Sequence, residues 1–275
     1  AGHPVAVTNR SRPSVDALAA EGAFPCEFPA EVAARSEVIF TMLPDAPHVE
    51  DVVFGENGLA ASMKPGSVLI DSTSNDPKSA EKVAAALAER GVEMLDAPVS
   101  GGVAGAAGGA LTFMVGGSES AFARAEPVLE PMAKAVVHAG PSGNGQAAKV
   151  CNNMMLAASM IVTSEAFALA DRLGLERQTM FDIVSSATGQ CWALTSYCPV
   201  PGPVPASPAN RDYQPGFTAA MMLKDLKLAQ DAAGGSGAET PLGRHAMELY
   251  ERFVEAGGAE TDFSGIIRML KGEDG

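Results

Sequence analysis

Residues 67–97 read SVLIDSTSNDPKSAEKVAAALAERGVEMLDA and contain a strand, a helix and a second strand in succession. The strands are predicted at Ser67–Asp71 and Val92–Ala97. The helix between them, Pro77–Arg90, has proline in its first turn and Gly91 directly after its end, the usual order of these residues at helix termini. Strands this apolar are typical of a parallel sheet that is covered by helices on both faces.

The same alternation continues on both sides of this segment. It predicts a doubly wound domain of the α/β class. Further strands are expected at Val5–Thr8, Ser36–Met42, Leu111–Val115 and Ala135–His138, and further helices at Ser14–Ala20, Pro47–Phe54 and Ser118–Met132.

The second half of the chain is predicted to be all helix. One long helical stretch runs from Gly145 to about Leu173, and no strand rich in Val and Ile follows it. Prolines between residues 199 and 215 exclude a helix interior and predict an extended loop. We therefore expect a first domain at residues 1–142 and an all-α domain at 143–275, which starts with the long interdomain helix. Its further helices are expected at Glu176–Ser186, Thr218–Ala233, Pro241–Ala256 and Ser264–Lys271.

Composition and charge exclude several classes of partner. The formal net charge of the 275-residue chain is −14, which repels the phosphates of nucleic acids and an anionic membrane surface. We expect no membrane span, because Asn152, Asn153 and Glu165 interrupt the longest apolar run. The four cysteines show no CxxC spacing, which indicates a reducing compartment, the cytoplasm or, in a eukaryote, the mitochondrial matrix. No metal site is expected, since His48 and His138 each lack a second ligand residue at the usual spacing.

The segment DAPVSGGVAGAAGG, residues 96–109, directly follows a predicted strand. One interpretation is a flexible turn. The other is a ligand site, because Ser100, Gly101 and Gly102 present a hydroxyl and backbone N–H groups where open α/β sheets bind ligands. Such N–H groups suit a carboxylate or another anion, and this interpretation is favoured.

Lys149 lies in the apolar first part of the long helix, and Asn153 follows on the same face one turn later. A lone lysine on a helix is usually solvated. The neighbours of Lys149 are mostly apolar, however, and a desolvated lysine can exchange a proton with a substrate hydroxyl. Lys224 and Asp225 lie in another apolar helical stretch, where an ordinary surface ion pair is an equal alternative.

Two further features have ordinary structural explanations. Residues 143–148, GNGQAA, match the dinucleotide fingerprint G-x-G-x-x-A. The helix that follows is longer than twenty residues and leads into more helix rather than a second parallel strand, so an interdomain turn is expected there. Trp192, the single tryptophan, is expected in the core, where tryptophan is most often found.

Short motifs are distributed along the whole chain. They are TMLP at 41–44, DST at 71–73, DAPVSGG at 96–102, LTFMVGG at 111–117, GNGQAAKVCNN at 143–153, CW at 191–192, PVPG at 199–202 and KDL at 224–226. In these motifs the chain resembles the 3-hydroxyisobutyrate dehydrogenases, within the wider β-hydroxyacid dehydrogenase family. Tartronate semialdehyde and glyoxylate reductases share Lys149 and Asn153, but they usually differ after the first Ser-Gly.

The resemblance implies a Rossmann-like domain and the oxidation of 3-hydroxyisobutyrate to methylmalonate semialdehyde by hydride transfer to NAD or NADP. It implies that Lys149 is the general acid/base and that Asn153 orients the substrate. Ser100, Gly101 and Gly102 would hold the substrate carboxylate. The other implied contacts are Asn153, Trp192 and Asp225 with the substrate, and Leu43, Pro44, His48, Ser74 and Lys224 with the cofactor.

Two features depart from the family pattern. The family begins with a strand, a G-x-G-x-x-G loop and a helix, roughly two dozen residues that would precede Ala1, and its first strand is expected to be central in the sheet. Without this segment we expect neither a stable sheet nor tight cofactor binding. After the strand at Val5–Thr8, the acidic residue of NAD enzymes is replaced by Asn9, Arg10 and Ser11, which suit a 2′-phosphate and favour NADP.

Two alternatives stay open. One is an NADPH-dependent reductase of a small semialdehyde, of the tartronate semialdehyde or glyoxylate type. The other is a catalytically silent nucleotide-binding scaffold, which the absent glycine loop suggests but Lys149 and Asn153 disfavour. The expected partners are a small hydroxyacid and further copies of the chain, as a homodimer or homotetramer through the helical domain, with no nucleic acid and no membrane.

Overall fold

The computed structural model describes residues 2–272 of the chain. It divides into two compact units, Ala1–Lys149 and Val150–Gly275, and each is described here by itself. The boundary expected between residues 142 and 143 directly precedes helix α7, Asn144–Leu173, whereas the compact units separate within the second turn of that helix.

The first unit contains a six-stranded sheet, a separate two-stranded sheet and helices. Its strands are β1 (Ala6–Val7), β2 (Phe24–Pro25), β3 (Val38–Thr41), β4 (Val68–Asp71), β5 (Glu93–Asp96), β6 (Val99–Ser100), β7 (Leu111–Gly116) and β8 (Ala133–Gly140). Its helices are α1 (Arg12–Ala20), α2 (Pro29–Arg35), α3 (Ala46–Phe54), α4 (Pro77–Ala88), α5 (Gly102–Ala107) and α6 (Glu119–Leu129), with short 3-10 turns at η1 (Leu59–Ala61) and η2 (Glu130–Met132).

The strands β3, β4 and β5 are parallel neighbours in the larger sheet. In their register Thr41, Asp71 and Asp96 lie side by side on consecutive strands. Since parallel strands end at one edge of a sheet, the loops that follow these three residues leave the sheet together. That edge carries most of the candidate site residues of this unit.

The larger sheet is not wholly parallel, which corrects the expectation from the strand pattern. β7 is antiparallel to both β5 and β6. Residues 101–110, including the short helix α5, are all that connects β6 to β7, and a parallel crossover needs roughly a dozen residues or more. The chain therefore reverses at α5, and β7 then pairs in parallel with β8.

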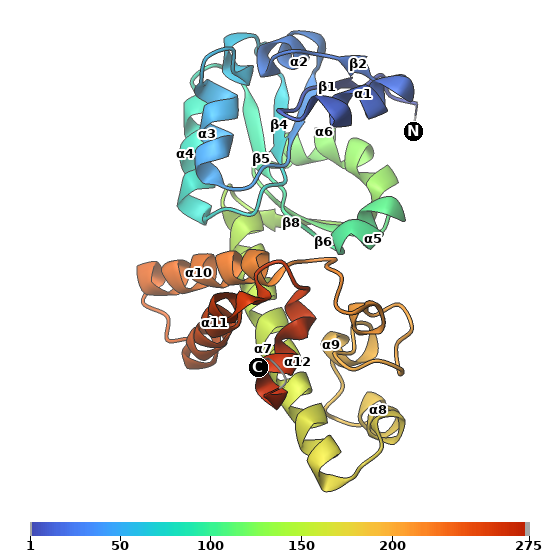
Figure 1. The fold of residues 1–275 in the computed structure, drawn as a ribbon. Helices are drawn as coiled ribbons and strands as arrows, with labels where there is room; N and C mark the ends of the chain where they lie inside the picture. The colour runs from blue at the N-terminus through green and yellow to red at the C-terminus, as the bar shows by residue number, and fades with distance from the viewer. Residues whose placement is uncertain (1, 273–275) are drawn as a thin grey trace. The chain divides into compact units, whose positions relative to one another are not determined.

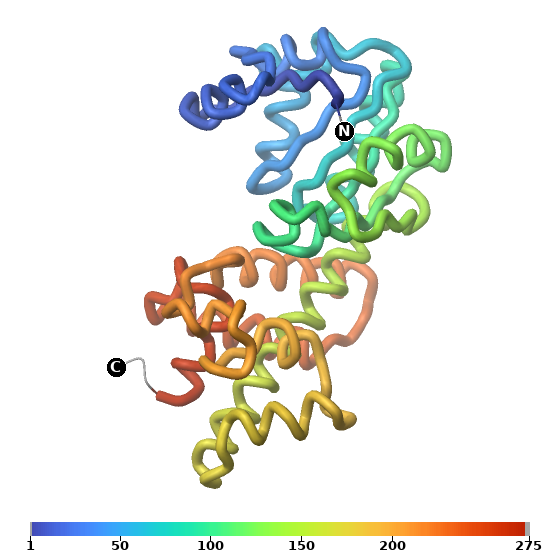
Figure 2. Tube along the Cα trace, turned by 90° about the vertical axis from the view of Figure 1, so that its right-hand side faces the viewer, coloured from blue at the N-terminus to red at the C-terminus, as the bar shows by residue number. Residues whose placement is uncertain are grey.

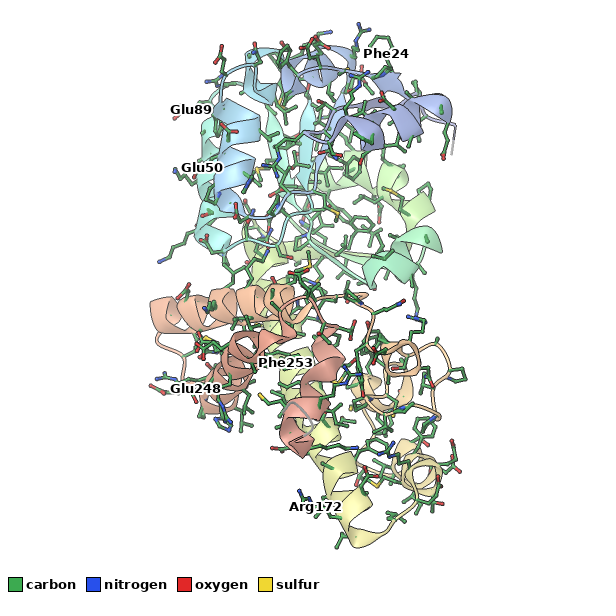
Figure 3. All side chains as sticks on the ribbon, viewed as in Figure 1. Phe24, Glu50, Glu89, Arg172, Glu248 and Phe253 are labelled. Atoms are coloured by element: carbon green, nitrogen blue, oxygen red, sulfur yellow. The ribbon has the colours of Figure 1, made fainter. Side chains whose placement is uncertain are left out.

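Helices cover both faces of the larger sheet, as expected for a doubly wound domain. The helices α3 and α4 lie on one face and α6 on the other (Figure 1). Alternate residues of β4 enter the two cores, with Leu69 packed on the α3 and α4 side, and Val68 and Ile70 on the α6 side. Because all three side chains are fully buried, the strand is apolar up to its last residue, Asp71. Glu50 and Glu89 lie on the outer side of the α3 and α4 layer (Figure 3).

The first predicted strand belongs to a different sheet from the others. β1 confirms a strand within Val5–Thr8, but β1 pairs with β2 in a two-stranded parallel sheet. The N–H groups of Phe24 and Cys26 donate to the carbonyls of Val5 and Val7, each at 2.8 Å. β3 is consequently an edge strand of the larger sheet. β2 was not predicted, because two residues are too few to show a periodic pattern.

Helices are the regular elements of the second unit among the residues that the structure describes, as expected, and apart from the short turn at residues 208–211 the segment 199–215 is the predicted loop. Met160 of α7 lies in the core of this unit. It shares one buried apolar cluster with Met222 and Leu226 of one later helix and with Leu249 and Tyr250 of another. Figure 2 shows these later helices, in orange and red, packed around the yellow-green α7 of this unit. The elements after α7 are α8 (Arg177–Ser185), α9 (Trp192–Thr195), η3 (Pro208–Arg211), α10 (Ala219–Ser236), α11 (Pro241–Phe253), η4 (Val254–Gly258), η5 (Phe263–Gly265) and α12 (Ile266–Lys271).

By length and composition alone, α7 could cross a membrane. Asn152, Asn153 and Glu165 do not take this helix below that limit of length and composition, which by itself is weak evidence for a span. The core helix of a globular protein can have the same length and composition, and 44% of the most apolar window of α7 is buried inside the protein. Burial against α10 and α11 explains part of its apolar character, whereas Met155, Val162, Leu169 and Leu173 of α7 are exposed.

Candidate active site

Lys149 lies in the second turn of α7 and is buried, with 9% of its surface exposed. Its Nζ donates a hydrogen bond of 2.8 Å to the backbone carbonyl of Val99. Val99 directly precedes Ser100 in β6. The structure therefore buries this lysine, as its apolar neighbours indicated, and holds its ammonium group beside the start of the glycine run.

Asp96, at the end of β5, fixes the first turn of α7. Its carboxylate accepts hydrogen bonds from the N–H groups of Gly143 and Gln146, at 2.8 and 3.0 Å. A carboxylate at a helix N-terminus satisfies donors that lack a partner within the helix and is favoured by the helix dipole. Burial raises the pKa of Asp96, and the hydrogen bonds from Gly143 and Gln146 oppose that rise. Asp96 thereby helps to determine where Lys149, one turn further on, is placed.

The segment GNGQAA forms the turn into α7, in agreement with its structural interpretation. Gly143 has φ +90°, a left-handed conformation that favours glycine. A β-carbon at Gly145 would collide with the carbonyl oxygens of Asp96 and Met114. These glycines allow the helix to begin directly against the ends of β5 and β7.

Asp71, at the end of β4, organises the loop that carries Ser74. Its fully buried carboxylate accepts hydrogen bonds from Thr41 Oγ1 at 2.9 Å, the Thr73 N–H at 3.2 Å and Asn75 Nδ2 at 3.3 Å. Burial raises the pKa of Asp71, and the bonds from Thr73 and Thr41 act in the opposite direction. The loop after β4 is thus held from within the sheet edge.

Ser100, Gly101 and Gly102 lead from β6 into α5. Ser100 is half-buried, and both glycines are exposed and have left-handed φ angles of +135° and +61°. The run is therefore a short helix with a glycine entry rather than the flexible turn of the first interpretation. Its role as a carboxylate site stays a prediction.

The loops after β3 and β4 are joined to each other. The N–H of Leu43 donates to Thr73 Oγ1 at 3.0 Å. Pro44 follows as an exposed residue, and the Nδ1 of His48 lies 2.5 Å from the Asp45 carboxylate that caps α3. The structure thus brings Leu43 and Pro44 to the same sheet edge as Ser74.

This edge fits a dinucleotide cofactor. The buried Ser72 Oγ and Asn75 Oδ1 have no hydrogen-bond partner within residues 2–272. Buried polar atoms are normally hydrogen-bonded, so such atoms at the carboxyl end of a strand are suited to a bound ligand. Leu43, Pro44 and Ser74 are the residues on these loops that would contact it.

Asn9, Arg10 and Ser11 form the loop between α1 and β1, a strand of the two-stranded sheet. Ser11 is the N-cap residue of α1, and its N–H lies 3.4 Å from Asn9 Oδ1. Arg10 is exposed. The loop is available to a phosphate, but its hydrogen bonds do not join it to the loops after β3 and β4 in the described part of the chain.

In the second unit, Asn153 is paired with Asp225. Both side chains are buried, with 1% and 4% of their surfaces exposed. Asn153 Nδ2 donates to Asp225 Oδ2 at 2.5 Å, and Asn153 Oδ1 accepts a bond of 2.9 Å from Asn152. Lys224 Nζ lies 3.6 Å from the other carboxylate oxygen of Asp225. Lys224 and Asp225 thus form an ion pair, but α10 turns the carboxylate of Asp225 into the core rather than onto the surface.

Trp192 is not a core residue, which corrects the structural expectation for it. Its side chain is half exposed and stacks on Tyr197, with ring centroids 5.0 Å apart. The residue before it, Cys191, contacts Thr163, which lies roughly 15 Å along α7 from Asn153. The contact of Trp192 with the substrate stays a prediction.

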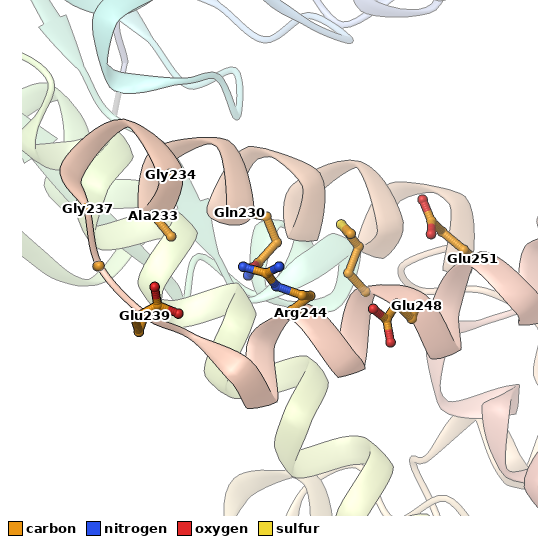
Figure 4. Close-up of a pocket in the computed structure, with 10 residues that line it drawn as sticks. Gln230, Ala233, Gly234, Gly237, Glu239, Arg244, Glu248 and Glu251 are labelled. Carbon is orange, nitrogen blue, oxygen red and sulfur yellow. The ribbon is translucent and has the colours of Figure 1, made fainter.

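A groove between α10 and α11 contains none of the predicted site residues. Gln230 and Gly234 line it from α10, and Arg244 and Glu248 from α11 (Figure 4). Its acidic residue Glu251 already pairs with a lysine on α10 at 3.2 Å. No group of three His, Cys, Asp or Glu side chains suited to a metal ion occurs within residues 2–272.

Sequence reasoning missed three residues that organise the site: Asp71, Asp96 and Gln146. Each is fully buried. Asp71 and Asp96 are each the last residue of a mainly apolar strand, and a carboxylate in that position was the available signal. Gln146 lies in a motif whose pattern indicates a turn, and such a pattern gives no signal for the role of its side chain.

The chain matches known proteins along its whole length. The family model of the NAD binding domain of 6-phosphogluconate dehydrogenase matches residues 1–140, and that of the NAD-binding domain of NADP-dependent 3-hydroxyisobutyrate dehydrogenase matches residues 143–270. A protein of Mycobacterium tuberculosis named "Probable 3-hydroxyisobutyrate dehydrogenase" is 47% identical over 271 residues, which are 98% of this chain and 91% of that protein.

Two further comparisons bear on the substrate. The NAD-dependent L-serine dehydrogenase of Pseudomonas aeruginosa is 44% identical over 270 residues, 98% of this chain and 91% of that protein. A solved structure of the Mycobacterium tuberculosis 3-hydroxyisobutyrate dehydrogenase with L-serine superposes with a TM-score of 0.92 at 47% identity, covering 98% of this chain and 91% of that one.

These matches cover both units, and they include the domain that binds the nicotinamide cofactor. They contradict the alternative of a catalytically silent scaffold, since the relatives are named as dehydrogenases. The chain belongs to the 3-hydroxyisobutyrate dehydrogenase family and is an NAD(P)-dependent dehydrogenase of hydroxyacids.

Proposed function

We propose that the chain oxidises 3-hydroxyisobutyrate to methylmalonate semialdehyde. The bound nicotinamide cofactor supplies the hydride acceptor. The observation that carries the proposal is the hydrogen bond from Lys149 Nζ to the Val99 carbonyl. It holds a desolvated Nζ next to Ser100, where backbone N–H groups and a hydroxyl suit a carboxylate, and the neutral amine form of Lys149 is the one that can accept a proton.

Each residue then has a defined task. The backbone of Ser100, Gly101 and Gly102 binds the substrate carboxylate, which selects a hydroxyacid over a simple alcohol. Lys149 takes the proton from the hydroxyl group as the hydride leaves the carbon that bears this hydroxyl. Asn153, one turn later in α7, orients the substrate, and its amide is held by Asp225. By resemblance, Lys224 and Trp192 complete the contacts to cofactor and substrate.

L-Serine is the second candidate substrate. A relative 44% identical to this chain is named an L-serine dehydrogenase, and the solved structure of the Mycobacterium tuberculosis relative is one with L-serine. The two substrates share a carboxylate and a 3-hydroxyl group and differ at the second carbon, where serine has an ammonium group and 3-hydroxyisobutyrate a methyl group. A buried ammonium group needs a polar or anionic partner, so the two substrates make different demands on the site.

We propose NADP as the preferred cofactor. Arg10 and Ser11 replace the acidic residue that bonds the ribose hydroxyls in NAD enzymes, and a guanidinium group can bind a phosphate through two hydrogen bonds. The exposure of Arg10 leaves it accessible to such a phosphate. We further propose a homodimer or homotetramer that assembles through the helical unit, in the cytoplasm or, in a eukaryote, the mitochondrial matrix.

A substrate and cofactor panel on the full-length protein tests the proposal. We expect kcat/KM for 3-hydroxyisobutyrate to exceed that for L-serine by roughly tenfold or more, about the effect of one well-placed or missing group. Reduction of tartronate semialdehyde and glyoxylate with NADPH is measured in parallel. If kcat/KM for L-serine, or for either reduction, is higher than that for 3-hydroxyisobutyrate, the proposed substrate is wrong.

A further inference from the structure

The side chain of Gln146, in the first turn of α7, forms hydrogen bonds with the backbone on both sides of Ser74. Its fully buried side chain donates from Nε2 to the Thr73 carbonyl at 2.7 Å. Its Oε1 accepts a bond of 2.9 Å from the N–H of Asn75. The two backbone groups it holds belong to the residues on either side of Ser74. Only one orientation of the amide satisfies both bonds, since a carbonyl needs a donor and an N–H needs an acceptor.

The same residue is tied to the strand that precedes the substrate segment. Its backbone N–H donates to Asp96 Oδ2 at 3.0 Å. Lys149 follows three residues later in the helix and is bonded to the Val99 carbonyl. Gln146 is therefore the side chain through which the loop of Ser74 is connected to the helix of Lys149.

We propose that Gln146 is a positioning residue, which fixes the cofactor loop at Ser74 relative to the amine of Lys149. The inference rests on the proposed function, in which Ser74 contacts the cofactor and Lys149 moves the proton. Gln146 touches neither the cofactor nor the substrate; it acts by holding backbone on both sides of a residue that does.

Loss of the two Gln146 side-chain hydrogen bonds would add unpaired polar groups to a loop that already contains some. Ser72 Oγ and Asn75 Oδ1 already lack a hydrogen-bond partner among the described residues. Removing the Gln146 amide would leave the Thr73 carbonyl and the Asn75 N–H unpaired as well. Buried groups of this kind are costly, so the loop would shift to regain partners. A shifted loop would present Ser74 differently to the cofactor.

The first experiment compares Gln146→Met with Asn144→Ala in the full-length protein. Methionine keeps the length of the side chain without its hydrogen bonds. Asn144→Ala removes a side-chain bond of 2.8 Å to the Ala139 carbonyl from the same turn of α7, but it leaves the loop after β4 intact. We expect Gln146→Met to raise the cofactor Kd and lower kcat roughly tenfold each, and Asn144→Ala to change neither by more than about twofold. The Kd is measured from the fluorescence of the reduced cofactor, without turnover.

A second variant separates positioning from a general loss of structure. In Gln146→Glu the ionised carboxylate can accept from Asn75 but repels the Thr73 carbonyl, whereas the protonated acid can make both bonds of the wild-type amide. The activity of this variant relative to wild type should rise several-fold as the pH falls from about 8 to about 6, since burial raises the pKa of a glutamic acid. The ratio for Gln146→Met should stay flat over the same range.

The other charged groups at this position are common to all variants. They are Asp96 at the Gln146 N–H, Asp71 under the loop, Glu81 of α4 near Gly143, and Lys149. Expressing each variant relative to wild type at the same pH cancels their titration. An unchanged cofactor Kd in Gln146→Met, or a flat ratio for Gln146→Glu, would overturn the positioning role.

The proposal and the proposed function fail differently. If Lys149→Ala retains full turnover, the catalytic assignment is wrong. The cofactor Kd of Gln146→Met still measures whether the Gln146 hydrogen bonds fix the loop at Ser74. If Lys149→Ala is inactive and Gln146→Met matches Asn144→Ala in Kd and kcat, only the positioning role is lost.

Discussion

Lys149 Nζ donates a hydrogen bond to the carbonyl of Val99, a residue fifty positions earlier in the chain and directly before Ser100. The bond places a buried amine beside the segment that is suited to a carboxylate. A 3-hydroxyacid carries its hydroxyl group two carbons from its carboxylate. One end of such a molecule can therefore lie on the backbone of β6 and α5 while the other reaches Lys149.

Lys149→Ala should abolish turnover and leave the cofactor Kd nearly unchanged. A general base acts in the transition state, so its loss lowers kcat, here by at least roughly 10²-fold. The exposed Lys134 of β8 provides a matched control, and Lys134→Ala should remain close to wild type. Turnover of Lys149→Ala within a few fold of wild type would reject the assignment.

Gly102→Ala should raise KM for hydroxyacids by about tenfold or more, the cost of roughly one lost hydrogen bond to a charged group. A β-carbon there obstructs the approach of the carboxylate, and it also strains a left-handed backbone. Gly109 has φ +60°, against +61° for Gly102, and lies in the same glycine run. Gly109→Ala therefore carries the same backbone strain, together with a close approach of its β-carbon to the Pro131 carbonyl at 3.2 Å. Equal KM values for the two variants would show that strain rather than the carboxylate is responsible.

Arg10→Ala should reduce kcat/KM for NADP by about tenfold and leave that for NAD within roughly twofold, because only the 2′-phosphate is lost as a partner. The control is Arg35→Ala, since Arg35 of α2 stacks on the ring of Phe24 instead, at 4.0 Å. If the wild type prefers NAD by tenfold and Arg10→Ala leaves NADP use unaffected, this loop does not bind phosphate.

Asp225→Ala should lower kcat about tenfold and destabilise the second unit, because the buried amide of Asn153 loses its acceptor. A buried donor left without a partner costs about 1–3 kcal/mol. Asp225→Asn retains an acceptor oxygen of the same shape and should keep most of the stability. Thermal unfolding and kcat are measured together, and identical losses in both variants would mean that the charge of Asp225, rather than its hydrogen bond, is what matters.

Asp171 should make the second unit sensitive to acid. It joins the ends of three helices, since it accepts two hydrogen bonds from Arg177 at 2.9 and 2.8 Å and one from Lys271 at 2.7 Å. These partners lower the pKa of Asp171 to about 2. A lowered pKa means that the ionised form stabilises the folded state at pH values above the ordinary pKa near 3.8, and that this contribution is lost as the pH falls toward 2.

The expected size of this contribution is about 1–2 kcal/mol, reduced because the side chain is partly exposed. It is measured as the free energy of unfolding between pH 5 and pH 2 for wild type and Asp171→Asn. The variant should show a smaller decrease. Asp182 of α8, which accepts a bond from Gln178, provides the control carboxylate. An equal decrease in Asp171→Asn and wild type would contradict the prediction.

The sequence was sufficient for the longer elements of both units, but not for the short ones β2, α2, β6, α5 and α9. Strands buried on both faces, such as β4, are apolar along most of their length, and helices such as α4 are marked by proline at the start and glycine beyond the end. The burial of Lys149 also followed from its apolar neighbours in α7. In each case the signal lies within a few residues of the element it predicts.

Only the tertiary structure decided the direction of β7, the separation of β1 from the larger sheet and the partners of the buried polar residues. Gln146 meets Thr73 and Asn75 across more than seventy positions, and Asn153 meets Asp225 across seventy-two. Periodic patterns report which face of an element is buried, but not which distant residue lies opposite. A polar side chain can be buried only when such a partner satisfies its hydrogen bonds, so its role becomes visible when folding has placed that partner beside it.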